Sequence, residues 1–148
     1  MEFKDLQQIS IMDVGGPHTF RTIYMDGRAH PKNLDPSYYG HSTGKWEGDT
    51  LVVDTVGFNE GFWISRGIPT TERLHMIERF TRTDSNTMKY EVTVDDPGAY
   101  TAPWTAGFLL SWNQGVELFE YICQENNFAS QLMLGSEQSV DRSSAIVP

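Results

Sequence analysis

Segments of β-branched and aromatic residues recur along this chain, and residues that favour turns separate them. The clearest case lies at residues 38–58, where Lys45-Trp46-Glu47-Gly48-Asp49-Thr50 divides a polar, aromatic segment from an apolar run at 51–56. A glycine-containing turn between two extended segments predicts a β-hairpin. Two further hairpins are predicted, joining residues 74–82 to 88–94 and residues 108–112 to 116–123. Because no pair of long amphipathic helices could cover an open sheet, we expect an all-β fold and no parallel α/β fold.

The segments amount to about eight strands joined mostly by hairpins. Eight antiparallel strands either close as an up-and-down barrel or stack as a sandwich. We expect the barrel, of the lipocalin or calycin type, because a meander closes naturally and closure removes the edge strands. The predicted domain covers residues 1–135, with a short helix at 128–134 and a flexible tail at 136–148. An eight-stranded barrel has room for packed side chains or one small ligand.

Length and charge narrow the classes of partner. The chain has 148 residues and a formal net charge of −9, from 11 Lys and Arg against 20 Asp and Glu. This balance argues against nucleic acid, whose phosphates need clustered basic residues, and against anionic lipid. No apolar run approaches the roughly 20 residues of a membrane span, and no signal peptide is recognisable. We therefore expect a small-molecule ligand, no nucleic acid and no membrane, and a homo-oligomer remains open.

Strand alternation assigns a side to the ionisable residues. In the segment 74–82, Glu78 alternates in phase with the apolar residues, and in the segment 51–56, Asp54 shares a face with two valines. A carboxylate among apolar neighbours is costly to bury unless it is paired, and its pKa then tends to rise. An imidazole group titrates near neutral pH, so His75 suits general acid–base chemistry. The candidate catalytic residues are Glu78, His75, Asp54 and Arg79.

Alternative arrangements of these residues remain open. Since His75 and Glu78 occupy opposite faces unless a bulge intervenes, the pairs Glu78–Asp54 and Glu78–Glu120 are variants of the proton-transfer site. Arg79 would steady developing negative charge together with Tyr24 or Tyr121. A purely structural alternative is that Glu78 and Glu120 form ion pairs on the outer surface, with Arg79, Arg82 or Lys89.

Aromatic and histidine residues supply candidates for ligand binding. Clustered aromatic rings form platforms for a sugar or an aromatic ligand, or they pack the core and the ends of the barrel. The candidate ligand-binding residues are Tyr24, His41, Trp46, Trp63, Trp104, Glu120 and Tyr121. No cofactor is predicted, because no two histidines have the short spacing that places two ligands on one element. A divalent metal would require His30, His41 and His75, with Glu78, from separate segments.

Several motifs carry a resemblance to a family. They are Gly44-Lys45-Trp46-Glu47-Gly48-Asp49-Thr50-Leu51-Val52-Val53-Asp54-Thr55, Tyr24-Met25-Asp26-Gly27-Arg28-Ala29-His30-Pro31, and Leu74-His75 followed by Glu78-Arg79-Phe80. With Asp96-Pro97 and Pro103-Trp104, the chain resembles a broad family of uncharacterised bacterial proteins, many of them longer at the N-terminus and carrying export signals. The resemblance implies no reaction, but it implies a periplasmic or secreted setting. This chain departs in lacking the longer N-terminal segment with its signal, and in having Thr70 after Pro69 where relatives often have His.

Two functional hypotheses follow from the sequence. The first is a small-molecule enzyme of the lyase, isomerase or hydrolase type that uses carboxylate and histidine acid–base chemistry inside a barrel. The second is a non-catalytic barrel that binds a hydrophobic, phenolic or carbohydrate ligand.

Overall fold

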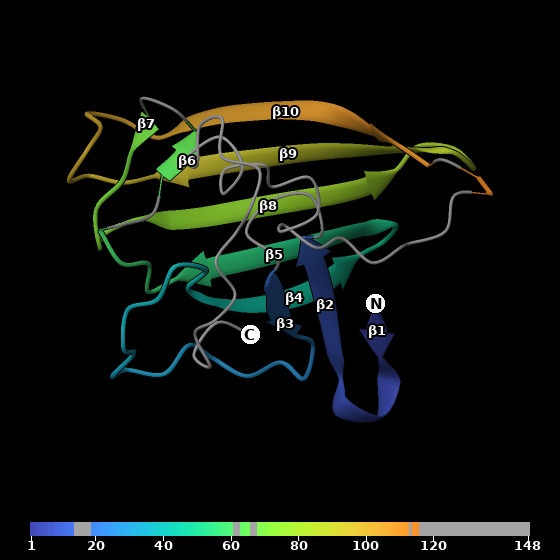
Figure 1. Cartoon of the computed structure of the whole chain (residues 1–148), viewed down its shortest axis with the longest axis horizontal. Helices are drawn as coiled ribbons and strands as arrows, with labels where there is room; N and C mark the ends of the chain where they lie inside the picture. Colours follow the sequence, from blue (N-terminus) through green and yellow to red (C-terminus); the bar gives the residue numbers. More distant parts are fainter. Residues whose placement is uncertain (14–18, 61–62, 66–67, 113, 116–148) are drawn as a thin grey trace, which may run out of the picture. The chain divides into compact units, whose positions relative to one another are not determined.

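The protein is all-β in a computed structural model that describes residues 1–13, 19–60, 63–65, 68–112 and 114–115 (Figure 1). The strands are β1 (Glu2–Phe3), β2 (Gln8–Asp13), β3 (Thr19–Tyr24), β4 (His41–Glu47), β5 (Thr50–Val56), β6 (Trp63–Ser65), β7 (Ile68–Pro69), β8 (His75–Arg82), β9 (Thr87–Asp95) and β10 (Trp104–Ser111). One 3-10 turn, η1 (Lys4–Leu6), joins β1 to β2. Within these described ranges, no helix is long and apolar enough to cross a membrane.

Residues Met1–Val116 form one compact unit, and Glu117–Pro148 are assigned to a second unit that lies outside the described residues. The predicted strand at 116–123, the helix at 128–134, the domain end at 135 and the tail at 136–148 all fall in this undescribed part. They stay predictions.

Eight of the strands form one mixed sheet in the order β1-β2-β3-β4-β5-β8-β9-β10, and β6 pairs with β7 separately. Every pairing in the large sheet is antiparallel except β3 with β4, which run parallel through Ile23↔Ser42 and Tyr24↔Thr43. The expectation of a purely antiparallel meander is wrong at this pair. A parallel pair needs a long connection, and the chain between β3 and β4, with Pro31 and Pro36, supplies it.

The sheet is open in the part of the chain that the structure describes. Its edges are β1 and β10, and these two strands do not pair with each other. The closed barrel is therefore not confirmed. Figure 1 shows β2 running across the direction of β4 and β5, so the sheet is not flat.

The first two predicted hairpins are confirmed. Strands β4 and β5 pair from His41↔Val56 to Glu47↔Thr50, and Gly48 in the turn has a φ of 61°, a left-handed conformation that favours glycine. Strands β8 and β9 pair from His75↔Asp95 to Arg82↔Met88. The sequence pattern at these hairpins is local, which is why it predicts them well.

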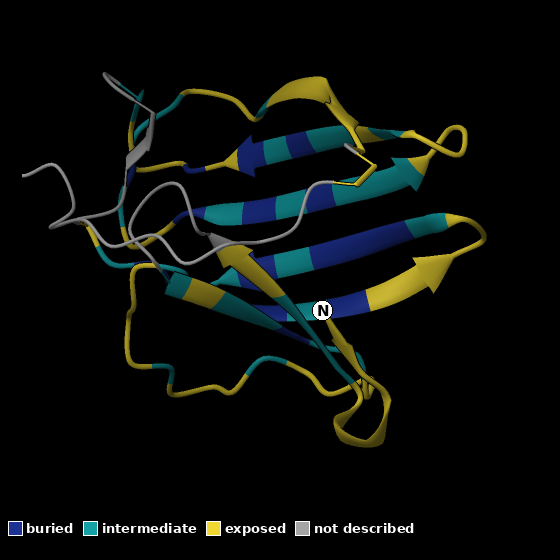
Figure 2. Cartoon of the chain, turned by 45° about the vertical axis from the view of Figure 1, so that its right-hand side comes forward, coloured by how far each residue is buried: buried dark blue, intermediate teal, exposed yellow. Residues whose placement is uncertain are grey.

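The large sheet has two faces with different chemistry. Paired residues of neighbouring strands project to the same side. We call the side that carries Val53, Glu78 and Val92 the core face, and the side that carries Thr43, Asp54 and Ile77 the outer face. Figure 2 shows that the buried residues concentrate along β5, β8 and β9 and on the first half of β4.

Two apolar clusters fill the core face. Val53 and Ile23 are fully buried and contact Leu51, and a second cluster forms around Val94 and Met76. Gly44 allows β3 to approach β4 at this point, because a Cβ there would lie 2.7 Å from Ile23 Cγ2. The same close approach brings the start of β4 beside the end of β3, where the candidate site begins.

Candidate active site

Three of the four histidines gather around one carboxylate on the outer face. His41 is the first residue of β4, Asp54 lies in β5 and His75 is the first residue of β8. His30 comes from the long connection between β3 and β4. These four residues, which we call the histidine cluster, are far apart in the sequence and meet because β4, β5 and β8 are neighbours.

The histidine cluster is held by short contacts between its ring nitrogens and the carboxylate. His75 Nε2 lies 2.9 Å from Asp54 Oδ1, and His30 Nε2 lies 3.3 Å from the same oxygen. The second ring nitrogen of His30, Nδ1, lies 2.8 Å from His41 Nδ1. Asp54 therefore contacts His75 and His30 directly, and His30 connects it to His41.

These contacts determine where the protons lie when the rings are neutral. An ionised carboxylate only accepts hydrogen bonds, so His75 and His30 each donate from Nε2 to Asp54. The Nδ1 of His30 is then an acceptor, and His41 Nδ1 must donate to it. As a result, His75 keeps a lone pair on Nδ1 and His41 keeps one on Nε2. Each of these nitrogens can take a proton from a substrate.

Electrostatics keep His41 in the basic form. Burial lowers the pKa of His41, and the neighbouring His30 ring and the Arg28 guanidinium lower it further. At neutral pH the imidazole is therefore uncharged and able to accept a proton. The side chains of Asp54 and His75 are 43% and 41% exposed, which leaves both open to a ligand from solvent.

A pocket borders the histidine cluster. It has a volume of about 300 Å³, and its lining includes His41, Tyr24, Tyr38 and Tyr39. The Tyr24 ring stacks on His41 with 5.1 Å between ring centroids, and the Arg28 guanidinium carbon lies 4.1 Å from the Tyr24 ring centroid. The pocket thus combines one basic nitrogen with aromatic walls and phenolic hydroxyl groups.

The histidines considered as metal ligands come together, but their geometry is that of a hydrogen-bonded cluster. Among the residues that the structure describes, no group of three His, Cys, Asp or Glu side chains is arranged to hold a metal ion. The Nε2 atoms of His30 and His75 both contact Asp54 Oδ1, and the Nδ1 atoms of His30 and His41 contact each other. Glu78, the fourth residue of that set, projects from the core face.

Glu78 belongs to a different arrangement. The prediction that it projects with the apolar residues is confirmed, and its side chain is 5% exposed. Its Oε2 lies 2.6 Å from Arg21 Nη2, and the Tyr90 hydroxyl donates to its Oε1 at 3.0 Å. Burial and the charge of Glu78 together raise the pKa of Tyr90. The structural alternative, in which Glu78 pairs on the outer surface with Arg79, Arg82 or Lys89, is wrong, because Glu78 projects from the core face and pairs with Arg21.

The register separates Glu78 from the other candidate catalytic residues. Asp54 pairs with Ile77 and Glu78 pairs with Val53, so the two carboxylates project from opposite faces. His75 lies on the face of Asp54. Arg79 also projects from the outer face, but there it contacts Glu47, with 3.1 Å between Nη1 and Oε2. One small substrate cannot contact Glu78 together with Asp54 or His75 across the sheet.

The candidate ligand-binding residues have several different locations. Tyr24 and His41 border the 300 Å³ pocket, whereas Trp46 is 59% exposed on the core face. Trp104 packs edge-on against Tyr100 and against the second apolar cluster. Glu120, Tyr121 and the side chain of Trp63 lie outside the described residues.

Sequence reasoning missed two partners of Glu78, namely Arg21 and Tyr90. Arg21 lies two residues before the buried Ile23 in β3, and the alternation of the strand places both on the core face. This alternation, read from the sequence, could have predicted that Arg21 projects from the core face. No comparable signal indicated that His30, in an irregular connection, would contact Asp54.

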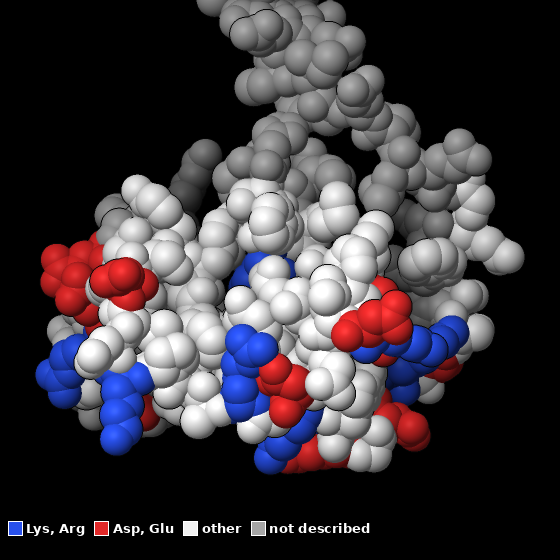
Figure 3. Space-filling view, turned by 90° about the horizontal axis from the view of Figure 1, so that it is seen from below, with Lys and Arg blue, Asp and Glu red and all other residues white. Residues whose placement is uncertain are grey.

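On the face seen in Figure 3, Lys and Arg side chains are interspersed with Asp and Glu side chains. No protein-family model, curated protein or solved structure matches this chain. The family resemblance of the motifs stays a prediction, and the site is interpreted from its own geometry.

Proposed function

We propose that the protein is an enzyme that performs general acid–base chemistry on a small molecule at the histidine cluster. The observation that carries this proposal is the pair of contacts from His75 and His30 to Asp54 Oδ1, at 2.9 Å and 3.3 Å. A carboxylate that fixes the tautomer of an imidazole also stabilises the imidazolium that forms when the ring takes a proton. General acid–base catalysis of this kind contributes about 10²–10⁴-fold in rate.

The arrangement supports two proton-transfer positions. His75, with its partner Asp54, provides one basic nitrogen on β8. His41 provides the other beside the aromatic pocket, and His30 connects it to the same carboxylate. One ring can abstract a proton while the second, once protonated, donates one to a leaving or adjacent oxygen.

The pocket favours a small, partly aromatic or hydroxylated substrate. A volume of about 300 Å³ is at the lower end of ligand pockets. Tyr38 offers a hydroxyl group for hydrogen bonding and a ring for stacking. Elimination, hydration, isomerisation and hydrolysis all use the groups that the site provides.

The proposal extends to the architecture. We propose that the large sheet is the wall of a barrel-like fold. This is supported by the core-face side chains of β2 and β10, two widely separated strands, which line one and the same pocket. Such curling is what closure of an eight-stranded sheet requires.

The test compares the wild type with Asp54→Asn against a panel of activated esters, epoxides, β-hydroxy ketones and α-hydroxy ketones. The asparagine variant keeps the shape of the side chain but removes the charge that stabilises an imidazolium. We expect turnover of at least one panel member by the wild type and a loss of about 100-fold or more in kcat/KM for the variant.

A matched control is Glu91→Gln, which removes an outer-face carboxylate of β9 that contacts Lys89. This variant should keep wild-type activity, and circular dichroism should show the same fold for all three proteins. Equal activity of Asp54→Asn and wild type, or the absence of turnover with every panel member, would contradict the proposal.

A further inference from the structure

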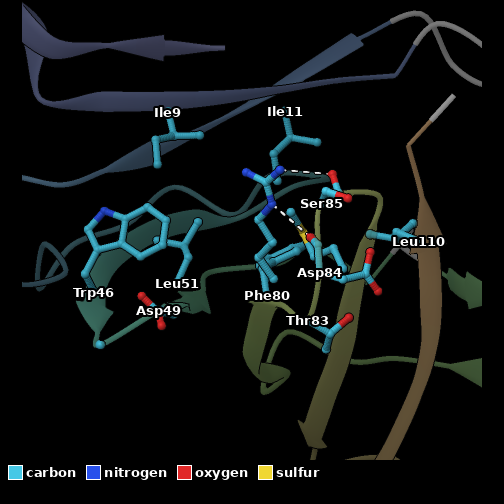
Figure 4. Close-up of a pocket in the computed structure, with 13 residues that line it drawn as sticks. Ile9, Ile11, Trp46, Asp49, Leu51, Phe80, Thr83, Asp84, Ser85 and Leu110 are labelled. Atoms are coloured by element: carbon cyan, nitrogen blue, oxygen red, sulfur yellow. Dashed lines mark hydrogen bonds between the residues drawn. The ribbon is translucent and has the colours of Figure 1, made fainter. Parts of the chain in front are cut away.

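A second and larger cavity lies on the other side of the sheet, at the end of the core face nearest the β4–β5 and β8–β9 turns. Its volume is about 960 Å³. Figure 4 shows Ile9 and Ile11 of β2 facing Leu51 and Phe80 across this space, with Trp46 and Leu110 at its sides. None of its lining residues belongs to the histidine cluster, so this cavity is independent of the proposed catalytic site.

The cavity is lined by large apolar side chains that remain accessible. Trp46 is 59% exposed, Leu110 is 40% exposed and Ile11 is 39% exposed. A contiguous group of exposed apolar side chains around a concave space marks a binding site more often than scattered exposed residues do. The volume is at the upper end of the range for pockets that enclose a small organic ligand.

The charged residues of the cavity lie in its two turns or directly beside them. Asp49 comes from the β4–β5 turn, and Asp84 comes from the β8–β9 turn with Arg82 beside it. The Arg82 guanidinium donates to the backbone carbonyls of Asp84 and Ser85, at 3.0 Å and 2.9 Å. The backbone N–H of Asn86 is the main group that lowers the pKa of Asp84, so its carboxylate is ionised at neutral pH.

Charge at this end of the cavity is negative. The lining contains two carboxylates, of Asp49 and Asp84, and one guanidinium, of Arg82. The Nε and Nη2 atoms of this guanidinium already donate to the backbone carbonyls of Asp84 and Ser85. A ligand group placed there gains most if it carries a positive charge or donates hydrogen bonds. An anionic head group would meet like charge and would lose affinity.

We propose that this cavity binds an amphipathic amine, with its hydrocarbon body against Phe80, Met88 and Leu110 and its ammonium group beside Asp49 and Asp84. The apolar body provides the affinity because it removes exposed apolar surface from water. The carboxylates provide the selectivity for a cation over an anion of equal chain length.

The first experiment measures decylamine and decanoate, both below their micellar concentrations, as competitors of the neutral fluorescent probe N-phenyl-1-naphthylamine. We expect saturable probe binding to the wild type and displacement by decylamine at about tenfold lower concentration than by decanoate, a difference equivalent to about 1.4 kcal/mol. Absence of saturable probe binding, or equal potency of the two competitors, would overturn the proposal.

Two neighbouring residues of β10 offer a matched pair of variants. Leu110 faces the cavity and pairs with Met88, whereas Leu109 faces the opposite side, pairs with Lys89 and is 66% exposed. We expect Leu110→Glu to weaken probe binding at least about tenfold and Leu109→Glu to change it less than about twofold. Equal effects of the two variants would place the bound probe elsewhere.

A third variant tests the head-group site. The double variant Asp49→Asn/Asp84→Asn should remove the preference for decylamine over decanoate while leaving affinity for the neutral probe unchanged. Retention of the preference would contradict the assigned ammonium position. Asp54→Asn should leave decylamine binding unchanged, so failure of this proposal and failure of the catalytic proposal are distinguishable.

Discussion

Two carboxylates on adjacent strands of one sheet show how surroundings decide what an ionisable group can do. Glu78 on the core face has a side chain 5% exposed, with Arg21 and Tyr90 as partners. Asp54 on the outer face has a side chain 43% exposed, and its partners are His75 and His30. The guanidinium of Arg21 is a permanent charge, whereas imidazoles gain and lose protons near neutral pH. A buried carboxylate depends on its permanent counter-charge, because loss of that partner leaves a buried charge unpaired. An accessible carboxylate with titratable partners can take part in chemistry.

The largest expected effect comes from removing the counter-charge of Glu78. Arg21→Met leaves a buried carboxylate unpaired, and we expect the free energy of unfolding to fall by about 3–5 kcal/mol. Denaturant unfolding followed by circular dichroism measures this change. The double variant Arg21→Met/Glu78→Leu should recover a large part of the loss, since no unpaired charge remains. If Arg21→Met were as stable as the wild type, the ion pair with Arg21 would not be what distinguishes Glu78 from Asp54.

The next effect is the dependence of stability on pH that arises from His41. Its pKa in the folded protein lies below the ordinary value of about 6.5, so the unfolded state binds more protons between these two values. Stability contributed by the neutral ring is fully present above about pH 6.5 and is lost as pH falls below it toward the lowered pKa.

Urea unfolding at a series of pH values between 7 and 5 measures this loss. His41→Gln should reduce the slope of unfolding free energy against pH in this range. A wild-type protein that becomes more stable on acidification from neutral pH would contradict the assigned direction.

A smaller effect on stability is expected for Asp54. Because the carboxylate and His75 are both more than two-fifths exposed, Asp54→Asn should lower the free energy of unfolding by less than about 1 kcal/mol. Thermal unfolding of Asp54→Asn, the variant proposed for the activity test, measures this change. A loss comparable with that of Arg21→Met would show that Asp54 has a structural role and would remove the contrast with Glu78.

The smallest effect is expected for the ion pair of Arg79 with Glu47. Both side chains are more than 40% exposed, at 43% and 41%, and Nη1 lies 3.1 Å from Oε2. Arg79→Met should therefore change stability by no more than about 0.5 kcal/mol. This variant is the matched control for Arg21→Met, since it also removes an arginine that contacts a glutamate. A large loss here would contradict the argument that burial makes the difference.

The fold was predictable where its causes are local. The β4–β5 and β8–β9 hairpins follow from turn residues between extended segments, and the side to which Glu78 projects follows from strand alternation. The parallel pairing of β3 with β4 was not predictable in this way, because an irregular connection of more than ten residues separates the strands. The histidine cluster depends on that same connection, since it delivers His30 to Asp54.

The identity of the site was predictable only in part. Asp54 and His75 were candidates from residue type and strand phase, and the structure brings them within hydrogen-bond distance. Glu78 was a candidate for the same reasons, but its role depends on Arg21, which comes from a strand 57 residues earlier in the sequence. Strand phase gives the face of each residue, and only the order of strands in the sheet gives its neighbours.

The most direct test of the central claim is the tautomeric state of the histidine rings at neutral pH, measured by ¹⁵N–¹H correlation NMR of the side chains. The structure predicts that His75 and His30 carry their protons on Nε2 and that His41 carries its proton on Nδ1. It also predicts that Asp54→Asn shifts the ring nitrogen signals of His75 and His30. Mixed tautomers for these rings, unchanged between wild type and Asp54→Asn, would contradict the claim that Asp54 orients them for proton transfer.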